Sequence, residues 1–335
     1  MVNTVSIDRL PAPTWNRLRV NDASVAWDAE NTVPLEDMRL TVAPGEKHPP
    51  VRFELADRGD AYSSGRLHLA AAAGSKVTVF ERCTVVQNLL GQVEVTVGEN
   101  ATVRLVQLLC PEQGAVLRHE VRVQCGQKGQ FQMITVLLGT GDVYADQQAQ
   151  LLGDGSGFTA DMAYLAAGTR RVDINLAVDH FGRDTTSVIQ ADGALLDGAQ
   201  KTFRGTIDFK RGSSGAVGSE NETVLLLGDR VVNKTVPLIL CAEENVDGSH
   251  GATIGEMDED TRFYFESRGI DREKAESMLA RAAVERLIRL TGDNAFAQAA
   301  EGKLEETLSE REEKRHEGLS GRLPVAGRNV GGLSG

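Results

Sequence analysis

One histidine stands out among the residues of this chain that could do chemistry. His250 lies in the segment GSHGAT, with Gly248 two positions before it and Gly251 directly after it. Glycines on both sides leave the imidazole free to reach a partner. Neutral imidazole binds iron, but a [4Fe–4S] cluster needs about four ligands. We therefore expect His250, if it binds metal, to share the metal with another chain; the alternative is a histidine held in a turn by local hydrogen bonds.

The cysteines give a weaker signal. The four are Cys83, Cys110, Cys125 and Cys241, and no two form a C-x-x-C pair that would indicate zinc or a cluster. The first three lie in or beside apolar runs, so we expect buried small hydrophobic residues. Cys241 ends the apolar run that starts at Val236. A sulfur acceptor is one interpretation of Cys241, and core packing is the favoured one.

Several catalytic motifs are missing from the sequence. It has no G-x-x-x-x-G-K-[ST] phosphate loop, no G-x-S-x-G elbow and no H-E-x-x-H motif. We therefore expect no ATP hydrolysis by this chain, no intrinsic cofactor and no enzyme activity. A β-helical polysaccharide lyase or hydrolase is the less favoured alternative, because such enzymes are usually secreted and no export signal is evident.

The net charge and the distribution of apolar residues argue against further classes of protein, namely nucleic-acid-binding, membrane and secreted proteins. The formal net charge is −12, which argues against nucleic acid as a partner. No apolar run approaches the ~20 residues of a membrane span, and the first residues, MVNTVSIDRLPAP, contain no apolar core of a secretory signal. We therefore expect a cytoplasmic protein with reduced thiols and no membrane partner.

Glycine-marked turns followed by short strands recur between residues 61 and 265. They begin at Gly74, Gly98, Gly126, Gly153, Gly182, Gly212 and Gly248, which are 24 to 36 residues apart. This period, without helices, favours a mainly β fold of the β-solenoid type over an antiparallel sandwich. Residues 1–60 contain six prolines and predict an irregular segment with short edge strands at Arg39–Val42 and Val51–Leu55.

After Ile270 the pattern becomes helical, which predicts a C-terminal helical region over residues 266–316. Asp271 can cap a helix whose apolar residues recur at helical spacing until Gly292. A second helix can begin at Asp293. Its apolar stripe is Phe296, Ala300, Leu304 and Leu308. Residues 317–335 are rich in glycine and predict a disordered tail.

The segment from Thr235 to Ile270, TVPLILCAEENVDGSHGATIGEMDEDTRFYFESRGI, resembles the SufB/SufD family of iron–sulfur cluster assembly scaffold proteins. The resemblance covers roughly residues 60–310. In the B-type pattern a cysteine follows a G-D-K turn, whereas Val231 follows Gly228-Asp229-Arg230 here. The B-type V-E-H-E-A-T is replaced by Gly248–Thr253, which keeps the histidine. The chain therefore looks like the SufD branch, in a short form without the N-terminal helical region of longer members.

The resemblance implies a right-handed parallel β-helix with C-terminal helices. It also implies a SufD-like scaffold subunit that pairs with a SufB-like scaffold through residues 225–255 and binds a SufC-like ABC ATPase through its helices. His250 would then be a metal ligand of a transient iron–sulfur cluster at the subunit interface. The residues expected to bind the ATPase are Met278, Leu279, Ala282, Leu287, Phe296 and Leu304. A purely structural partner without a cluster ligand, and a homodimer, stay open as alternatives.

Overall fold

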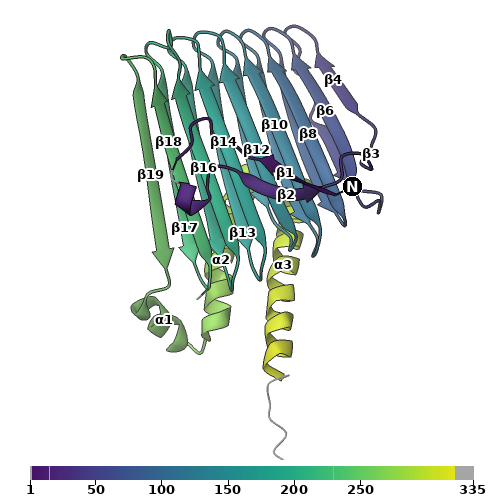
Figure 1. Cartoon of the computed structure of the whole chain (residues 1–335), viewed down its shortest axis with the longest axis vertical. Helices are drawn as coiled ribbons and strands as arrows, with labels where there is room; N and C mark the ends of the chain where they lie inside the picture. Colours follow the sequence, from purple (N-terminus) through teal and green to yellow (C-terminus); the bar gives the residue numbers. More distant parts are fainter. Residues whose placement is uncertain (1, 15, 229, 321–335) are drawn as a thin grey trace, which may run out of the picture.

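The computed structural model is a parallel β-solenoid followed by helices, as Figure 1 shows. It describes residues 2–14, 16–228 and 230–320, with only the backbone of residue 16 and residues 312–320. The first sheet contains β3 (Val33–Pro34), β4 (Met38–Val42), β6 (Ser63–Ala71), β8 (Asn88–Val97), β10 (Val116–Cys125), β12 (Asp142–Leu151), β14 (Arg171–His180), β16 (Gln200–Phe209) and β18 (Val232–Cys241). The second contains β5 (Val51–Ala56), β7 (Lys76–Val85), β9 (Thr102–Pro111), β11 (Gln130–Leu137), β13 (Gly157–Ala166), β15 (Thr186–Leu195), β17 (Val217–Leu226) and β19 (Asp247–Glu256).

From β4 on, successive strands alternate between the two sheets, and each sheet is parallel throughout. Each strand therefore pairs with the strand one full turn of the solenoid earlier. Leu67 pairs with Val93, 26 residues on, and Gly205 with Pro237, 32 residues on. This repeat confirms the predicted β-solenoid. The inward-facing alternate residues of both sheets form one apolar core along the stack.

The solenoid begins earlier than residue 61. The segments predicted as edge strands are β4 and β5, and they pair with β6 and β7, so they already belong to the solenoid. The helical region also begins earlier than residue 266, at Glu259. Of the predicted disordered tail, residues 317–320 belong to the last helix, whereas residues 321–335 lie outside the described part.

In the described part of the chain, three helices follow the last strand: α1 (Glu259–Glu266), α2 (Arg272–Leu290) and α3 (Asn294–Ser320). The predicted cap of α2 is present, since Asp271 accepts a hydrogen bond from the Lys274 amide; Asp293, predicted as the first residue of the second helix, directly precedes α3 and accepts a hydrogen bond from the Phe296 amide. The predicted stripe of α3 is buried, and with α2 it covers an apolar patch on the outer face of the second sheet. The helices therefore complete the fold of this chain.

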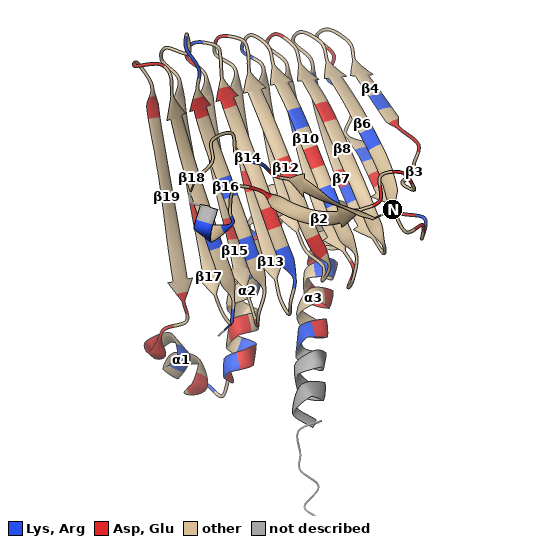
Figure 2. Ribbon diagram, in the orientation of Figure 1, with Lys and Arg blue, Asp and Glu red and all other residues tan. Residues whose placement is uncertain are grey.

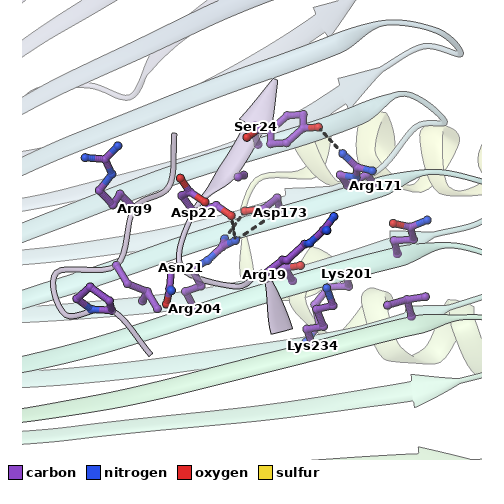
Figure 3. Close-up of a pocket in the computed structure, with 17 residues that line it drawn as sticks. Arg9, Arg19, Asn21, Asp22, Ser24, Arg171, Asp173, Lys201, Arg204 and Lys234 are labelled. Carbon is purple, nitrogen blue, oxygen red and sulfur yellow. Dashed lines mark hydrogen bonds and ion pairs between the residues drawn. The ribbon is translucent and has the colours of Figure 1, made fainter. Parts of the chain in front are cut away.

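An N-terminal hairpin lies across the outer face of the first sheet, which the sequence did not predict (Figure 1). Strands β1 (Asn3–Ile7) and β2 (Ala23–Trp27) are antiparallel and are joined through a short 3₁₀ helix, η1 (Asn16–Leu18). Buried Arg204 holds the segment, because it is paired with Asp173 and donates to the carbonyls of Val20 and Asp22 (Figure 3). A pocket of about 940 Å³ remains between this segment and the sheet.

Buried Arg170 fixes two successive turns of the solenoid at the end nearest the helices. Its guanidinium donates to the carbonyls of Gly141 and Leu138 at 2.8 Å each, and to that of Leu165. Burial lowers the Arg170 pKa to about 10, so the side chain stays charged at neutral pH. Each carbonyl would otherwise be buried without a donor, which is unfavourable.

We expect Arg170→Met to destabilise the protein by about 3 to 5 kcal/mol, because three buried carbonyls lose their donor. Urea denaturation measures the effect. Arg183→Met is the control, since Arg183 lies in an exposed turn and pairs there with Asp154; it should cost less than about 1 kcal/mol. Equal losses for the two variants would contradict the role of Arg170.

Inward-facing His180 is a buried histidine that the fold keeps neutral. Its ring nitrogens form hydrogen bonds with Thr185 Oγ1 (2.8 Å) and Ser187 Oγ (2.9 Å), and the ring packs on Phe209. Burial lowers the His180 pKa from 6.5 to about 4. Between pH 6.5 and about 4, His180 is therefore protonated in the unfolded chain but stays neutral in the folded chain.

This histidine should make the protein acid-sensitive. The contribution of His180 to stability is complete above pH 6.5 and is lost as the pH falls toward 4, to a maximum of about 3 kcal/mol. The free energy of unfolding at pH 7 and pH 4.5, measured with urea, checks this. In His180→Asn the drop between these pH values should be about 2 to 3 kcal/mol smaller; an unchanged drop would refute the assignment.

Candidate functional site

The last turn of the solenoid, formed by β18 and β19, has one uncovered side. Both strands end their sheets, so among the described residues no strand pairs with their outer edges (Figure 1). Their side chains are half-buried or exposed, in contrast to the buried pattern of the strands before them. Ile254 on β19 is 57% exposed. This end thus presents free backbone hydrogen-bonding groups together with apolar side chains.

His250 lies in the middle of this exposed strand. It is in register with Glu220 of β17, whose side chain is buried in the solenoid interior. Residues in register face the same side of a sheet, so His250 occupies an inward position that no further turn covers. The sequence pattern placed His250 after a turn at Gly248. The predicted turn at Gly248 is wrong, and so is the alternative that His250 is held in a turn by local hydrogen bonds. Both residues belong to β19, which runs from Asp247 to Glu256.

Beneath His250 the interior is polar. The Glu222 carboxylate accepts hydrogen bonds from Tyr164 Oη (3.0 Å) and Thr235 Oγ1 (2.6 Å) and pairs with the Lys201 ammonium. Burial, and secondarily the nearby Glu222 charge, raise the pKa of Glu220 to about 7. One oxygen of Glu220 has no hydrogen-bond partner among the described residues. The site thus combines an exposed imidazole with buried carboxylates behind it.

Small residues make room for this polar group. A Cβ at Gly205 would lie 2.2 Å from the Glu220 carboxylate, and a Cβ at Gly193 would lie 2.2 Å from the Tyr164 ring. Both glycines are in strands, where glycine packs poorly and often marks close approach of another group. The glycines therefore leave the space inside the solenoid that the Glu220 and Tyr164 side chains occupy.

Cys241 and Val231 complete the comparison with the predicted site. Cys241 ends β18 and is exposed in this chain, so the expectation of core packing is wrong. Val231, at the position expected to bear cysteine in the B-type pattern, is half-buried and packs on the core. Asp229 of the preceding turn lies outside the described residues. Among the residues described, His250 belongs to no group of three or more metal-ligand side chains.

Such a group does lie deep in the solenoid, and it includes Cys83. Glu81 Oε1 is 3.0 Å from His119 Nε2 and 3.6 Å from Cys83 Sγ, and all three residues are fully buried. Burial favours a higher pKa for Glu81, but His119 beside it holds that pKa below the ordinary value. Cys83 was predicted to be a buried residue, and it is part of the apolar core, although the Glu81 carboxylate lies beside its sulfur. The alternation from Val77 through Glu81 to Val85 was the signal that Glu81 faces inward.

The other two cysteines behave as predicted. Cys110 is buried between the second sheet and the helices, and Cys125 lies in the solenoid core. Burial raises the thiol pKa of each to about 12, so neither is a reactive thiolate at neutral pH.

The expected ATPase-binding residues separate into two groups. Leu287, Phe296 and Leu304 are buried against the chain's own second sheet, so the structure corrects the prediction for these three. Leu279 is partly buried there too. Met278 is 44% exposed and Ala282 is exposed, so these two are available to a partner. Helix α1, which was not proposed as a contact, exposes Phe263 (71%) and Tyr264 (53%).

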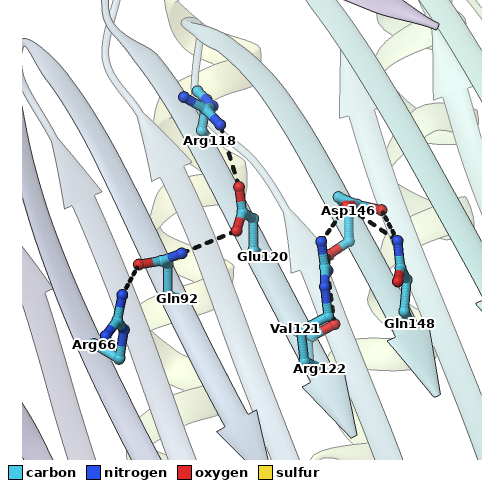
Figure 4. A network of polar contacts seen from close by, with 8 residues as sticks. All are labelled: Arg66, Gln92, Arg118, Glu120, Val121, Arg122, Asp146 and Gln148. Carbon is cyan, nitrogen blue, oxygen red and sulfur yellow. Dashed lines mark hydrogen bonds and ion pairs between the residues drawn. The ribbon is translucent and has the colours of Figure 1, made fainter. Parts of the chain in front are cut away.

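The outer face of the first sheet carries interleaved charges of both signs, as Figure 2 shows. In one network Arg66 donates to Gln92, and Gln92 and Arg118 both donate to Glu120 (Figure 4). Arg122, on the same strand as Glu120, pairs with Asp146 of the neighbouring β12. Basic groups here are largely neutralised by acidic ones, which does not favour nucleic acid. No helix in the described residues is long and apolar enough to span a membrane.

Comparisons with known proteins agree with this geometry. Iron-sulfur cluster assembly protein SufD of Bacillus subtilis is 26% identical over 154 residues, covering 46% of this chain and 35% of that protein. SufB of the same organism is 27% identical over 136 residues, covering 40% and 29%. A SufBD family protein of Pyrococcus horikoshii is 24% identical over 243 residues, covering 71% and 54%.

These matches span between about a third and about half of the length of the curated relatives. A family model described as "SUF system FeS cluster assembly, SufBD core domain" matches residues 53–283. The matched region contains the solenoid from β5 to β19, with His250, and continues into α2. Since it spans more than half of the sequence, the chain belongs to the SufBD family of the SUF iron–sulfur cluster assembly system.

Proposed function

We propose that this chain is a SufD-like scaffold subunit that pairs with a SufB-like scaffold through β18 and β19. The supporting observation is the uncovered last turn, because open edge strands pair readily with a strand of another chain. Exposed Ile254 adds apolar contact area on the same turn. A second copy of this chain is the alternative partner for the same edge.

In this assembly His250 contributes one ligand to a transient iron–sulfur cluster, and the partner supplies the others. The proposal is supported by the exposed inward position of His250 and by the absence of accompanying ligands within the described residues. The cluster is cargo of the assembly. We infer that the chain has no catalytic activity of its own, and that it works in the cytoplasm. The family match gives the polysaccharide-active alternative no support.

We further propose that a SufC-like ABC ATPase binds to α1 and to the exposed side of α2. Phe263 and Tyr264 on α1, with Met278 and Ala282 on α2, are the candidate contact residues. Aromatic residues and methionine are enriched at protein interfaces. The buried sides of α2 and α3 are already occupied by the solenoid, so the ATPase would leave that packing unchanged.

His250→Ala should keep the fold, because the side chain is exposed, and should lower cluster formation with a SufB-like partner about tenfold or more. Anaerobic reconstitution followed by iron, sulfide and absorbance measurements gives the yield. Ser249→Ala, at the adjacent outward position, is the control, and His250→Cys should restore part of the yield. Full yield in His250→Ala, with normal pairing, would favour a purely structural partner.

Phe263→Glu should weaken binding of the ATPase at least tenfold, because a charge replaces an exposed aromatic contact. The matched control is Phe181→Glu. Phe181 is also exposed, and it follows β14 at the end of the solenoid opposite α1. Affinity is measured by calorimetry with the purified full-length chain. Equal affinity of both variants and the parent chain would exclude α1 from the interface.

A further inference from the structure

Three ligand atoms of different chemistry meet inside the early turns of the solenoid. Glu81 and Cys83 come from β7 and His119 comes from β10, and their ligand atoms all lie within 4.8 Å of one another. The group lies many strands from His250, which is on β19. All three side chains have no exposed surface. A carboxylate, a thiol and an imidazole are the ligand types that bind zinc and iron in proteins.

The backbone places this group by register. Glu81 and Cys83 alternate with outward residues of β7, so both face the interior. His119 pairs with Gly91 of the neighbouring strand, and a Cβ at Gly91 would lie 2.9 Å from the imidazole. Glycine at this position therefore leaves the space that the ring occupies. A β-branched residue, common in strands, would exclude it.

The separations of the ligand atoms suit a single ion. With metal bonds of about 2.0 to 2.3 Å and tetrahedral angles, ligand atoms lie about 3.3 to 3.6 Å apart. Glu81 Oε1 is 3.6 Å from Cys83 Sγ and 3.0 Å from His119 Nε2. A shift of a few tenths of an ångström at His119 would bring its distance from Glu81 Oε1 into this range.

Neighbouring side chains support and extend the group. The second Glu81 oxygen accepts a hydrogen bond from Gln107 (2.6 Å), and Gln107 in turn accepts one from Thr135 (2.9 Å). Such outer hydrogen bonds orient metal-binding carboxylates. Gln147 is also buried, on β12 in register with Val121, which lies two residues along β10 from His119, and both its amide oxygen and its amide nitrogen lack a partner among the described residues. Unpaired buried polar atoms commonly mark a missing ion or water.

Charge also favours a divalent ion. One carboxylate, one thiolate and one neutral imidazole balance a 2+ charge, so the loaded group is neutral in a low-dielectric interior. Binding would release the thiol proton of Cys83. Because the group is sealed, we expect the metal to enter while the chain folds.

We propose that Glu81, Cys83 and His119 bind one divalent first-row transition-metal ion, Zn²⁺ or Fe²⁺, with a water as fourth ligand. This site is independent of His250 and of the assembly proposed above. It would link the early turns of the solenoid, since the ligands come from both sheets.

The test is anaerobic refolding of the full chain with equimolar Zn²⁺ and Fe²⁺, followed by desalting and elemental analysis. We expect about one metal ion per chain, and the ion retained distinguishes the two metals. Cys83→Ser and His119→Gln should each retain less than a tenth as much. Cys125→Ala is the matched control, because Cys125 is a buried cysteine of the same core outside this group, and it should keep the full amount.

Two further measurements cover variants that fold poorly. Refolding with Co²⁺ should give a thiolate-to-cobalt charge-transfer band in the parent chain and in Cys125→Ala, and no such band in Cys83→Ser. Metal should also raise the melting temperature of the parent chain but not that of His119→Gln. A metal-free parent chain after refolding, or full metal content in Cys83→Ser, would overturn the proposal.

Discussion

The structure depends on one constraint: each inward side chain lies directly above its counterpart from the previous turn of the parallel ladder. An apolar residue meets an apolar residue, and the core continues. A buried polar side chain cannot form hydrogen bonds with water, so it needs a hydrogen-bond partner from an adjacent turn or from the opposite sheet. Glu81, Gln107 and Thr135 satisfy this need in one column, because they pair in register on β7, β9 and β11.

The same constraint explains why the last turn is the chemically distinctive part. Glu220 and Glu222 sit in the penultimate turn, where a charged side chain is still enclosed. One turn further, His250 occupies the equivalent position without cover. A partner strand placed on β19 would enclose the imidazole next to those carboxylates. The ladder would then continue into the second chain, and its interior would become a shared one.

Local signals in the sequence predicted much of this fold, and long-range contacts account for what was missed. Asp271, Asp293 and the stripe from Phe296 to Leu308 identified α2 and α3, but not α1, because caps and helical periodicity involve neighbouring residues. Spaced glycines predicted the solenoid. The Glu81–His119 contact joins residues 38 positions apart, and Arg204 reaches Val20 across 184. Exposure of Cys241 depends on the stack ending at β18, which an apolar run cannot reveal.

The C-terminal helices have two roles: α2 and α3 cover the second sheet, and α1 is left exposed for binding. The second sheet presents apolar residues on its outer face, including Phe80 and Val106, so it needs a cover to be stable in water. Helices α2 and α3 provide this cover with Leu287, Phe296 and Leu304. Removing the helices to test a partner would expose that face and destabilise the solenoid. Contacts made by α1 can be changed without this effect, because none of its residues is buried.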